Sequence, residues 1–189
     1  MKKNKTKILV TGSAGFIGFH FCKLSLENKN NIIHGIDNLN NYYDKKLKMK
    51  RISILEKKKN FFFFKMDINS NKLERLFKKF NYDIVINLAA QAGVRYSIYN
   101  PNVYFNSNVK GFFNLLDNCR KYKIKHLLFA STSSVYGNSK KFPLKENYST
   151  DKPLSFYAAT KKTNETMAFS YSAIYKIPIT TLRFFTVFG

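Results

Sequence analysis

The chain has 189 residues, the size of one domain, and its 44% hydrophobic and 23% charged content is ordinary for a globular protein. Its apolar segments are short and bounded by charge, which excludes a transmembrane helix, and the two cysteines (Cys22 and Cys119) have neither CxxC spacing nor a nearby histidine cluster. No metal site is therefore predicted, a reducing cytoplasm is the expected location, and the net charge of +22 raises the question of polyanionic partners.

Short, nearly continuous apolar runs alternate with longer amphipathic stretches along the whole chain. The predicted strands, which we expect to be buried on both faces, are Lys7–Thr11, Ile32–Asp37, Phe61–Met66, Ile84–Leu88, His126–Ala130 and Ile179–Arg183. The predicted helices are Phe16–Asn28, Tyr43–Lys57, Asn71–Phe80, Val103–Tyr122 and Phe156–Tyr175. This alternation predicts an α/β fold with a doubly wound parallel sheet, and no linker divides residues 1–189 into two domains.

Nucleic-acid binding is the function that the charge alone would suggest. However, Lys, Asn, Ile, Phe and Tyr are enriched together while Trp is absent, as an A/T-rich genome would produce without any selected basic patch. The lysines are also scattered over predicted helix surfaces and loops, as with Lys45, Lys46, Lys48 and Lys50. Nucleic acid is therefore the less favoured partner, although small anions such as dinucleotides and sugar nucleotides would still be attracted.

The first predicted strand runs directly into a glycine-rich turn, Thr11-Gly12-Ser13-Ala14-Gly15-Phe16-Ile17-Gly18. Gly12 permits a tight turn, Gly15 allows close approach of a pyrophosphate, and Gly18 allows the helix to pack closely on the sheet. Free N–H groups in the first helical turn, at Phe16 and Ile17, suit a phosphate. Between a strand and a helix, this spacing predicts a dinucleotide site of the Rossmann type.

Three further segments follow predicted strands and should meet at the same edge of the sheet. Asp37, with Asn38, ends the second strand, where a carboxylate can bind the ribose hydroxyls of NAD and would repel the 2′-phosphate of NADP; a helix cap or turn is the alternative. Asp67 and Ile68 are placed near the adenine, and the small residues among Leu88, Ala89, Ala90 and Gln91 leave room for a cofactor. The sequence therefore predicts NAD.

Tyr157 and Lys161 form a YxxxK pair one helical turn apart, so both side chains leave the same face of a helix. A phenol has a pKa of about 10, and a nearby ammonium lowers it by favouring the phenolate. The pair is thus a candidate acid/base, although an exposed i,i+4 pair has the same spacing. A hydroxyl-rich run upstream, Ser131-Thr132-Ser133-Ser134, offers further groups, or is simply turn chemistry.

Five segments in order resemble the extended short-chain dehydrogenase/reductase family of NAD-dependent sugar-nucleotide epimerases and dehydratases. They are TGSAGFIG (11–18), NLAAQAGVRYS (87–97), ASTSSVYG (130–137), YAATK (157–161) and LRFFTVFG (182–189). The likeness is greatest to UDP-glucuronate 4-epimerases, also through Asn-Asn-Tyr-Tyr-Asp at 40–44. It covers essentially the whole chain and implies an isomerase of nucleotide-sugar metabolism.

The resemblance assigns a role to each matching position. Thr132 would bond the sugar 4-OH in a catalytic triad with Tyr157 and Lys161, and Lys161 would also bind the nicotinamide ribose. Phe185 and Thr186 match positions beside the nicotinamide and the sugar. Arg95, Ser97 and Ser133 would contact substrate, although a solvated surface role for Arg95 is equally open.

In this family, the residues that follow the position of Thr132 differ between enzymes that catalyse different reactions. Dehydratases have acidic residues there for elimination of water, whereas this chain has Ser133-Ser134. The resemblance therefore favours 4-epimerisation of a UDP-sugar, UDP-glucuronate to UDP-galacturonate, through a 4-keto intermediate. UDP-glucose 4-epimerisation, 4,6-dehydration and an NAD-binding module without turnover are the alternatives.

The resemblance also implies a further substrate-binding lobe and a second subunit. Family members continue past the position of Gly189 into a substrate-binding lobe, so we expect most of the sugar site to lie beyond this chain. A separate polypeptide could supply that lobe. The stretches Val103–Tyr122 and Phe156–Tyr175 match helices that form a four-helix dimer interface in the family. A homodimer is therefore expected.

Overall fold

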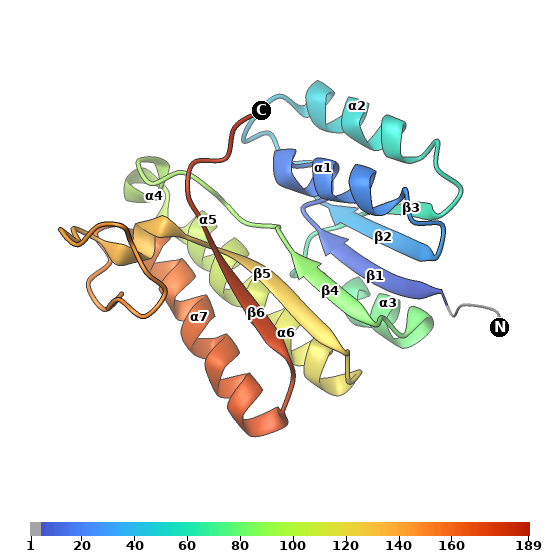
Figure 1. The fold of residues 1–189 in the computed structure, drawn as a ribbon. Coiled ribbons are helices and arrows are strands. Elements are labelled where there is room, and N and C mark those ends of the chain that lie inside the picture. Colours follow the sequence, from blue (N-terminus) through green and yellow to red (C-terminus); the bar gives the residue numbers. More distant parts are fainter. Residues whose placement is uncertain (1–4) are drawn as a thin grey trace.

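A six-stranded parallel sheet forms the centre of the computed structural model, which describes residues 5–189. The strand order is β3-β2-β1-β4-β5-β6, and helices cover both faces (Figure 1). The strands are β1 (Thr6–Thr11), β2 (Asn31–Asp37), β3 (Phe61–Lys65), β4 (Ile84–Asn87), β5 (His126–Thr132) and β6 (Ile179–Phe184). The predicted doubly wound α/β fold is confirmed.

The helices divide between the two faces of the sheet. Their bounds are α1 (Phe16–Ser25), α2 (Lys45–Leu55), α3 (Lys72–Phe80), α4 (Tyr96–Tyr99), α5 (Pro101–Tyr104), η1 (a π-helix, Phe105–Lys110), α6 (Gly111–Lys121), η2 (a 3-10 turn, Ser133–Tyr136) and α7 (Phe156–Tyr175). Helices α1 and α2 lie on one face, and α3, α6 and α7 lie on the other (Figure 1).

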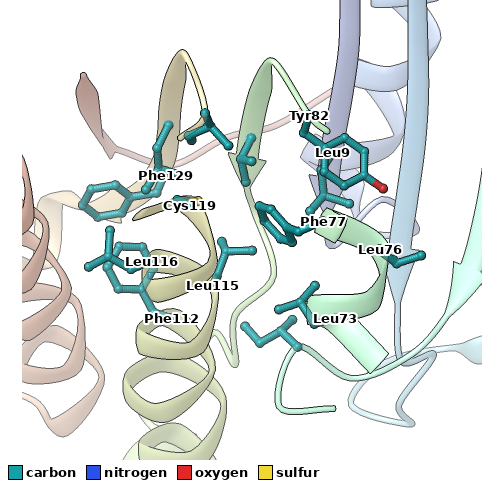
Figure 2. Close-up of a cluster of buried hydrophobic side chains, with 14 of the residues drawn as sticks. Leu9, Leu73, Leu76, Phe77, Tyr82, Phe112, Leu115, Leu116, Cys119 and Phe129 are labelled. Atoms are coloured by element: carbon teal, nitrogen blue, oxygen red, sulfur yellow. The ribbon is translucent and has the colours of Figure 1, made fainter. Parts of the chain in front are cut away.

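Each face has its own hydrophobic core. Phe77 on α3, Phe112 and Leu115 on α6, and Phe129 on β5 are fully buried beneath one face (Figure 2). On the other face, Phe19 and Cys22 of α1 pack with residues of α2 and of the strands. Because apolar side chains leave the central strands in both directions, the sheet is fixed between two helical layers.

The structure corrects three sequence expectations. The helix predicted over Val103–Tyr122 begins at Pro101, where proline suits the first helical position, and contains the π-helical segment η1. The short helix α4 and the turn η2 were not predicted, since four residues are too few for a periodic pattern. The third strand lies at the sheet edge instead of the centre, so Phe62 is 48% exposed and not buried on both faces.

Candidate functional site

A cavity of about 290 Å³ opens at the carboxyl edge of the sheet, where β1, β2 and β4 end. The predicted cofactor residues that line it are Gly12, Gly15, Phe16, Ile17, Gly18, Asp37, Asn38, Asp67, Ile68, Leu88, Ala89, Ala90 and Gln91. They come from four βα connections, which a parallel sheet brings to one edge. The fold thus gathers the residues that the sequence predicted for one site.

The glycine turn leaves no space for side chains between β1 and α1. Gly12 has φ +69°, and a Cβ there would lie 2.7 Å from the backbone nitrogen of Ala89. A Cβ on Gly18 would overlap the carbonyl oxygen of Gly12. The start of α1 is therefore held close to the end of β1, and its first residues face the cavity, as required for an anion at a helix N-terminus.

Asp37 is fixed at the end of β2 by two backbone groups. Its Oδ2 accepts a hydrogen bond from the N–H of Ala14 at 3.2 Å, and its Oδ1 accepts one from the N–H of Leu39 at 2.8 Å. The carboxylate lines the cavity and has further lone pairs to accept hydroxyl donors. Its role toward a ribose stays a prediction.

Sequence reasoning missed the segment after Asp37, which contributes Asn40, Tyr42 and Tyr43 to the cavity wall. The Asn-Asn-Tyr-Tyr-Asp run at 40–44 carries a signal that could have identified this segment, because its polar and aromatic residues closely follow the carboxyl end of β2. Asp44 ends this segment by accepting a hydrogen bond from the N–H of Lys46 at 2.8 Å. That cap explains why α2 begins later than the predicted Tyr43.

Lys48 is buried, so the expectation that the lysines around the start of α2 lie on the surface is wrong for this residue. It is only 4% exposed and lines the cavity, because its Nζ donates to the main-chain oxygen of Asn40 at 3.0 Å and to the Oδ1 of Asn40 at 2.6 Å. The ammonium also lies 4.3 Å from the centre of the Tyr43 ring. Burial lowers the pKa of Lys48, and the charge of Asp37 opposes that shift.

The YxxxK pair lies on α7, which begins at the predicted residue with Ser155 as its cap. Lys161 is buried and its Nζ donates to the carbonyl oxygen of Ala130 at 2.8 Å, on β5. Burial lowers the pKa of Lys161 to about 8. The alternative interpretation, that Tyr157 and Lys161 form a solvent-exposed i,i+4 pair, is therefore wrong.

Burial also raises the pKa of Tyr157, while a hydrogen bond with Thr132 acts in the opposite direction. The expected lowering of the Tyr157 pKa by the Lys161 ammonium is not what this arrangement gives, because the loss of water around the phenol dominates. Thr132, at the end of β5, is buried, and its Oγ1 accepts a hydrogen bond from the N–H of Ser134 at 3.2 Å. Tyr157, Lys161 and Thr132 thus meet at the junction of α7 and β5.

A buried chain of hydrogen bonds links this junction to the cavity. Asn108, in the π-helical segment η1, donates to the carbonyl oxygen of Gln91 at 3.0 Å and to the Thr160 Oγ1 at 3.1 Å. The Thr160 hydroxyl in turn donates to the main-chain oxygen of Tyr157 at 2.7 Å. The irregular turn of η1 therefore places Asn108 between the cavity wall and α7, a use common for π-helical segments.

The other residues predicted to contact substrate or cofactor do not line the cavity. Phe185 is 60% exposed and lines a second groove along β6, outside the cavity, and Thr186 is exposed beside it. Arg95 is exposed just before α4, whereas Ser97 is buried and its hydroxyl donates to the Val94 carbonyl at 2.6 Å. Ser133 is half-buried in η2. Their substrate and cofactor roles stay predictions.

Among residues 5–189, no three or more His, Cys, Asp and Glu side chains gather into a group that could hold a metal ion. None of the helices in this part of the chain combines the length and the apolar character needed to cross a membrane.

Residues 8–189 match the model of the NAD dependent epimerase/dehydratase family. Protein CapI of Staphylococcus aureus is 48% identical over 97% of this chain and 54% of its own length. UDP-glucuronate 4-epimerase 4 of Arabidopsis thaliana is 46% identical over 98% of this chain and 43% of its own length. UDP-glucuronic acid 4-epimerase from Bacillus cereus, solved with UDP-glucuronic acid and NAD, superposes with a TM-score of 0.91 at 38% identity, over 97% of this chain and 58% of that one.

The chain spans about half the length of the curated relatives it matches, 54% of Protein CapI and 43% of UDP-glucuronate 4-epimerase 4. The matched part includes the glycine turn, the hydroxyl run and the YxxxK pair, which the fold brings to one edge of the sheet. With this geometry and a family model that covers nearly all of its residues, the chain belongs to the NAD dependent epimerase/dehydratase family.

Proposed function

We propose that this chain carries the NAD site and the catalytic residues of a sugar-nucleotide 4-epimerase that interconverts UDP-glucuronate and UDP-galacturonate. The observation that carries the proposal is the junction of α7 and β5, where Tyr157, Lys161 and Thr132 meet beside a glycine-walled cavity. The sugar is chosen from the relatives, several of which are UDP-glucuronate 4-epimerases at 43–46% identity.

The residues of the cavity fit NAD. The close packing at Gly12 and Gly18 leaves the start of α1 free to face a pyrophosphate, and Asp37 is held where it can accept ribose hydroxyls. The Asp37 carboxylate would repel the extra phosphate of NADP. When bound, NAD would supply a reversible hydride acceptor for C4 of the sugar.

The protein groups then handle the proton of the sugar 4-OH. Tyr157 is the candidate base that accepts this proton and later returns it, and Thr132 is placed to orient the hydroxyl. Because burial raises the pKa of Tyr157, its phenolate needs positive charge close by, and Lys161 is the buried cation on the same helix face. Removal of the 4-OH proton and the C4 hydrogen gives a 4-keto sugar, and return of hydride to its other face inverts C4.

The residues after Thr132 support epimerisation over 4,6-dehydration. The turn η2 contains Ser133 and Ser134, neither of which can serve as the acid that elimination of water requires. UDP-glucose is the alternative sugar, since solved UDP-glucose 4-epimerases also share this fold at 30–32% identity.

We propose a homodimer in a reducing cytoplasm, in which both buried cysteines stay free. We further propose that a substrate lobe, on the same polypeptide or on a separate chain, completes the sugar site. A UDP-sugar is the partner we propose, and neither nucleic acid nor a membrane is proposed as one.

The test is to incubate the purified protein with NAD and UDP-glucuronate and to separate the products by chromatography. UDP-galacturonate should form, and Tyr157→Phe should abolish its formation, because the phenyl ring cannot accept the 4-OH proton. UDP-glucose, supplied in parallel, tests the alternative sugar. NAD binding without any product from either sugar would instead identify this chain as a cofactor-binding part without turnover.

A further inference from the structure

Glu165 lies on α7, one turn after Lys161 and two turns after Tyr157, and its side chain is only 10% exposed. Its Oε1 accepts hydrogen bonds from the Ser131 hydroxyl at 2.5 Å and from the Arg183 Nε at 3.0 Å, and its Oε2 accepts one from the Arg183 Nη2 at 2.9 Å. The carboxylate therefore joins α7 to both β5 and β6, the two strands beside it (Figure 1).

Arg183 is itself held by further partners. It pairs with Ser131 in the register of β5 and β6. Its Nη1 donates to the Tyr136 hydroxyl at 3.0 Å and to the carbonyl oxygen of Glu146 at 2.9 Å, and the guanidinium lies 4.9 Å from the centre of the Tyr136 ring. A planar guanidinium with this many partners cannot follow the carboxylate if α7 turns.

Three successive residues of β5 face three residues of α7. The Ala130 carbonyl binds Lys161, the Ser131 hydroxyl binds Glu165, and Thr132 interacts with Tyr157. Of these, only the middle contact is a carboxylate fixed by an arginine, which makes it the strongest of the three.

We propose that Glu165 is a positioning residue, which with Arg183 fixes the rotation of α7 against the end of β5 and so sets Tyr157 against Thr132. The proposal rests on the function proposed above. Glu165 lines the groove along β6 and not the cavity, and its hydrogen bonds go to Ser131 and Arg183 and not to Tyr157, so it acts through the placement of α7. A displacement of about 1 Å at a reacting group can cost about 10²-fold in rate.

The test substitution is Glu165→Gln, which keeps the size of the side chain and one acceptor but loses the charge and the two-pronged contact with Arg183. Asp117→Asn is the matched control, because Asp117 pairs with Arg120 at 2.8 Å on α6 and takes no part in the α7–β5 contacts. Ser131→Ala is a milder second variant that leaves the ion pair intact. All variants are assayed at a temperature at which circular dichroism shows them folded.

The first readout is kcat and KM with NAD and UDP-glucuronate, corrected for the fraction of protein that binds NAD. We expect Glu165→Gln to lower kcat by about 10- to 100-fold with KM little changed, Ser131→Ala to lower it less, and Asp117→Asn to leave it unchanged. A folded Glu165→Gln protein with the kcat of the parent would overturn the proposal.

The second readout needs no turnover. Protein labelled with ¹³C at the lysine ε-carbon is titrated by NMR, and the Lys161 signal is assigned by its loss in Lys161→Met. If Glu165 holds α7 in place, Glu165→Gln should admit water to the Lys161 ammonium and move its titration upward toward that of an ordinary lysine. An unmoved Lys161 titration would refute the positioning role, whereas an inactive parent protein with a moved titration would count only against the proposed function.

Discussion

Lys161 lies in an environment that is unusual for a lysine. Its ammonium is buried between α7 and β5, and the bond to the Ala130 carbonyl replaces only part of its hydration. Burial therefore lowers its pKa to about 8 from an ordinary 10.5. A cation placed at such a cost to stability fits a role in chemistry, since Lys161 lies one helical turn from the candidate base Tyr157 on the same face of α7.

The low pKa predicts how the stability of the protein changes with pH. Below pH 8 Lys161 is charged in the folded and the unfolded chain, so the cost of burial is fully present. Between pH 8 and 10.5 the folded state loses the proton first and the unfolded chain binds more protons, so this group makes stability rise with pH. In Lys161→Met this contribution should vanish.

The measurement is urea unfolding of both proteins from pH 7.5 to 10.5. The difference in unfolding free energy, parent minus Lys161→Met, should grow by about 3 kcal/mol across this window. Titration of other tyrosines and lysines affects both proteins alike and cancels in the difference. Parallel curves would show that Lys161 titrates as a solvated amine.

At the scale of elements, the contact between β1 and α1 decides whether the nucleotide cavity exists. The helix can approach the strand only because Gly18 has no side chain where it faces the Gly12 carbonyl. The adjoining turn needs glycine as well, since Gly12 has φ +69° and lies against the backbone of Ala89. The shape of the cavity floor thus depends on the absence of a Cβ atom at Gly12 and Gly18.

Gly18→Ala should force α1 away from β1. We expect a loss of about 1–3 kcal/mol in the free energy of unfolding, as for other overpacked sites, together with weaker NAD binding. Urea unfolding and isothermal titration calorimetry with NAD measure the two effects. Lys23→Ala, on the exposed side of the same helix, serves as the control and should change neither; equal behaviour of the two variants would mean that the contact is not tight.

At the scale of the molecule, the surface of α6 and α7 exposes several large apolar side chains, although the protein has a net charge of +22. These side chains include Phe113 on α6, and Phe169 and Ile174 on α7. The two helices lie side by side on one face of the sheet (Figure 1). Such a surface favours association with a second copy, in agreement with the proposed homodimer.

Phe169, which is 78% exposed, offers a direct test of that association. Phe169→Asp should shift the protein from dimer to monomer in analytical ultracentrifugation, because a carboxylate would have to be desolvated in the interface. Leu24→Asp, a comparably exposed position on α1, should leave the dimer intact. A parent protein that sediments as a monomer would contradict the homodimer.

Much of this architecture followed from local pattern. The glycine spacing and the alternating apolar runs predicted the sheet, the order of its elements along the chain and most residues of the cavity, because each depends on neighbours in the chain. The same patterns failed where distant contacts decide: Phe62 is exposed because β3 lies at an edge, and Lys48 is buried because the segment before α2 folds over it.

The type of fold, the family and the available chemical groups could be inferred from residue types at fixed spacings. The surroundings of each group depend instead on how the whole chain folds. The pKa of Tyr157 is raised because burial removes water from the phenol. Glu165 joins three elements because β5 and β6, which lie 47 residues or more apart in sequence, pair in register beneath α7. Burial and long-range pairing depend on the whole chain, so no local pattern contains them.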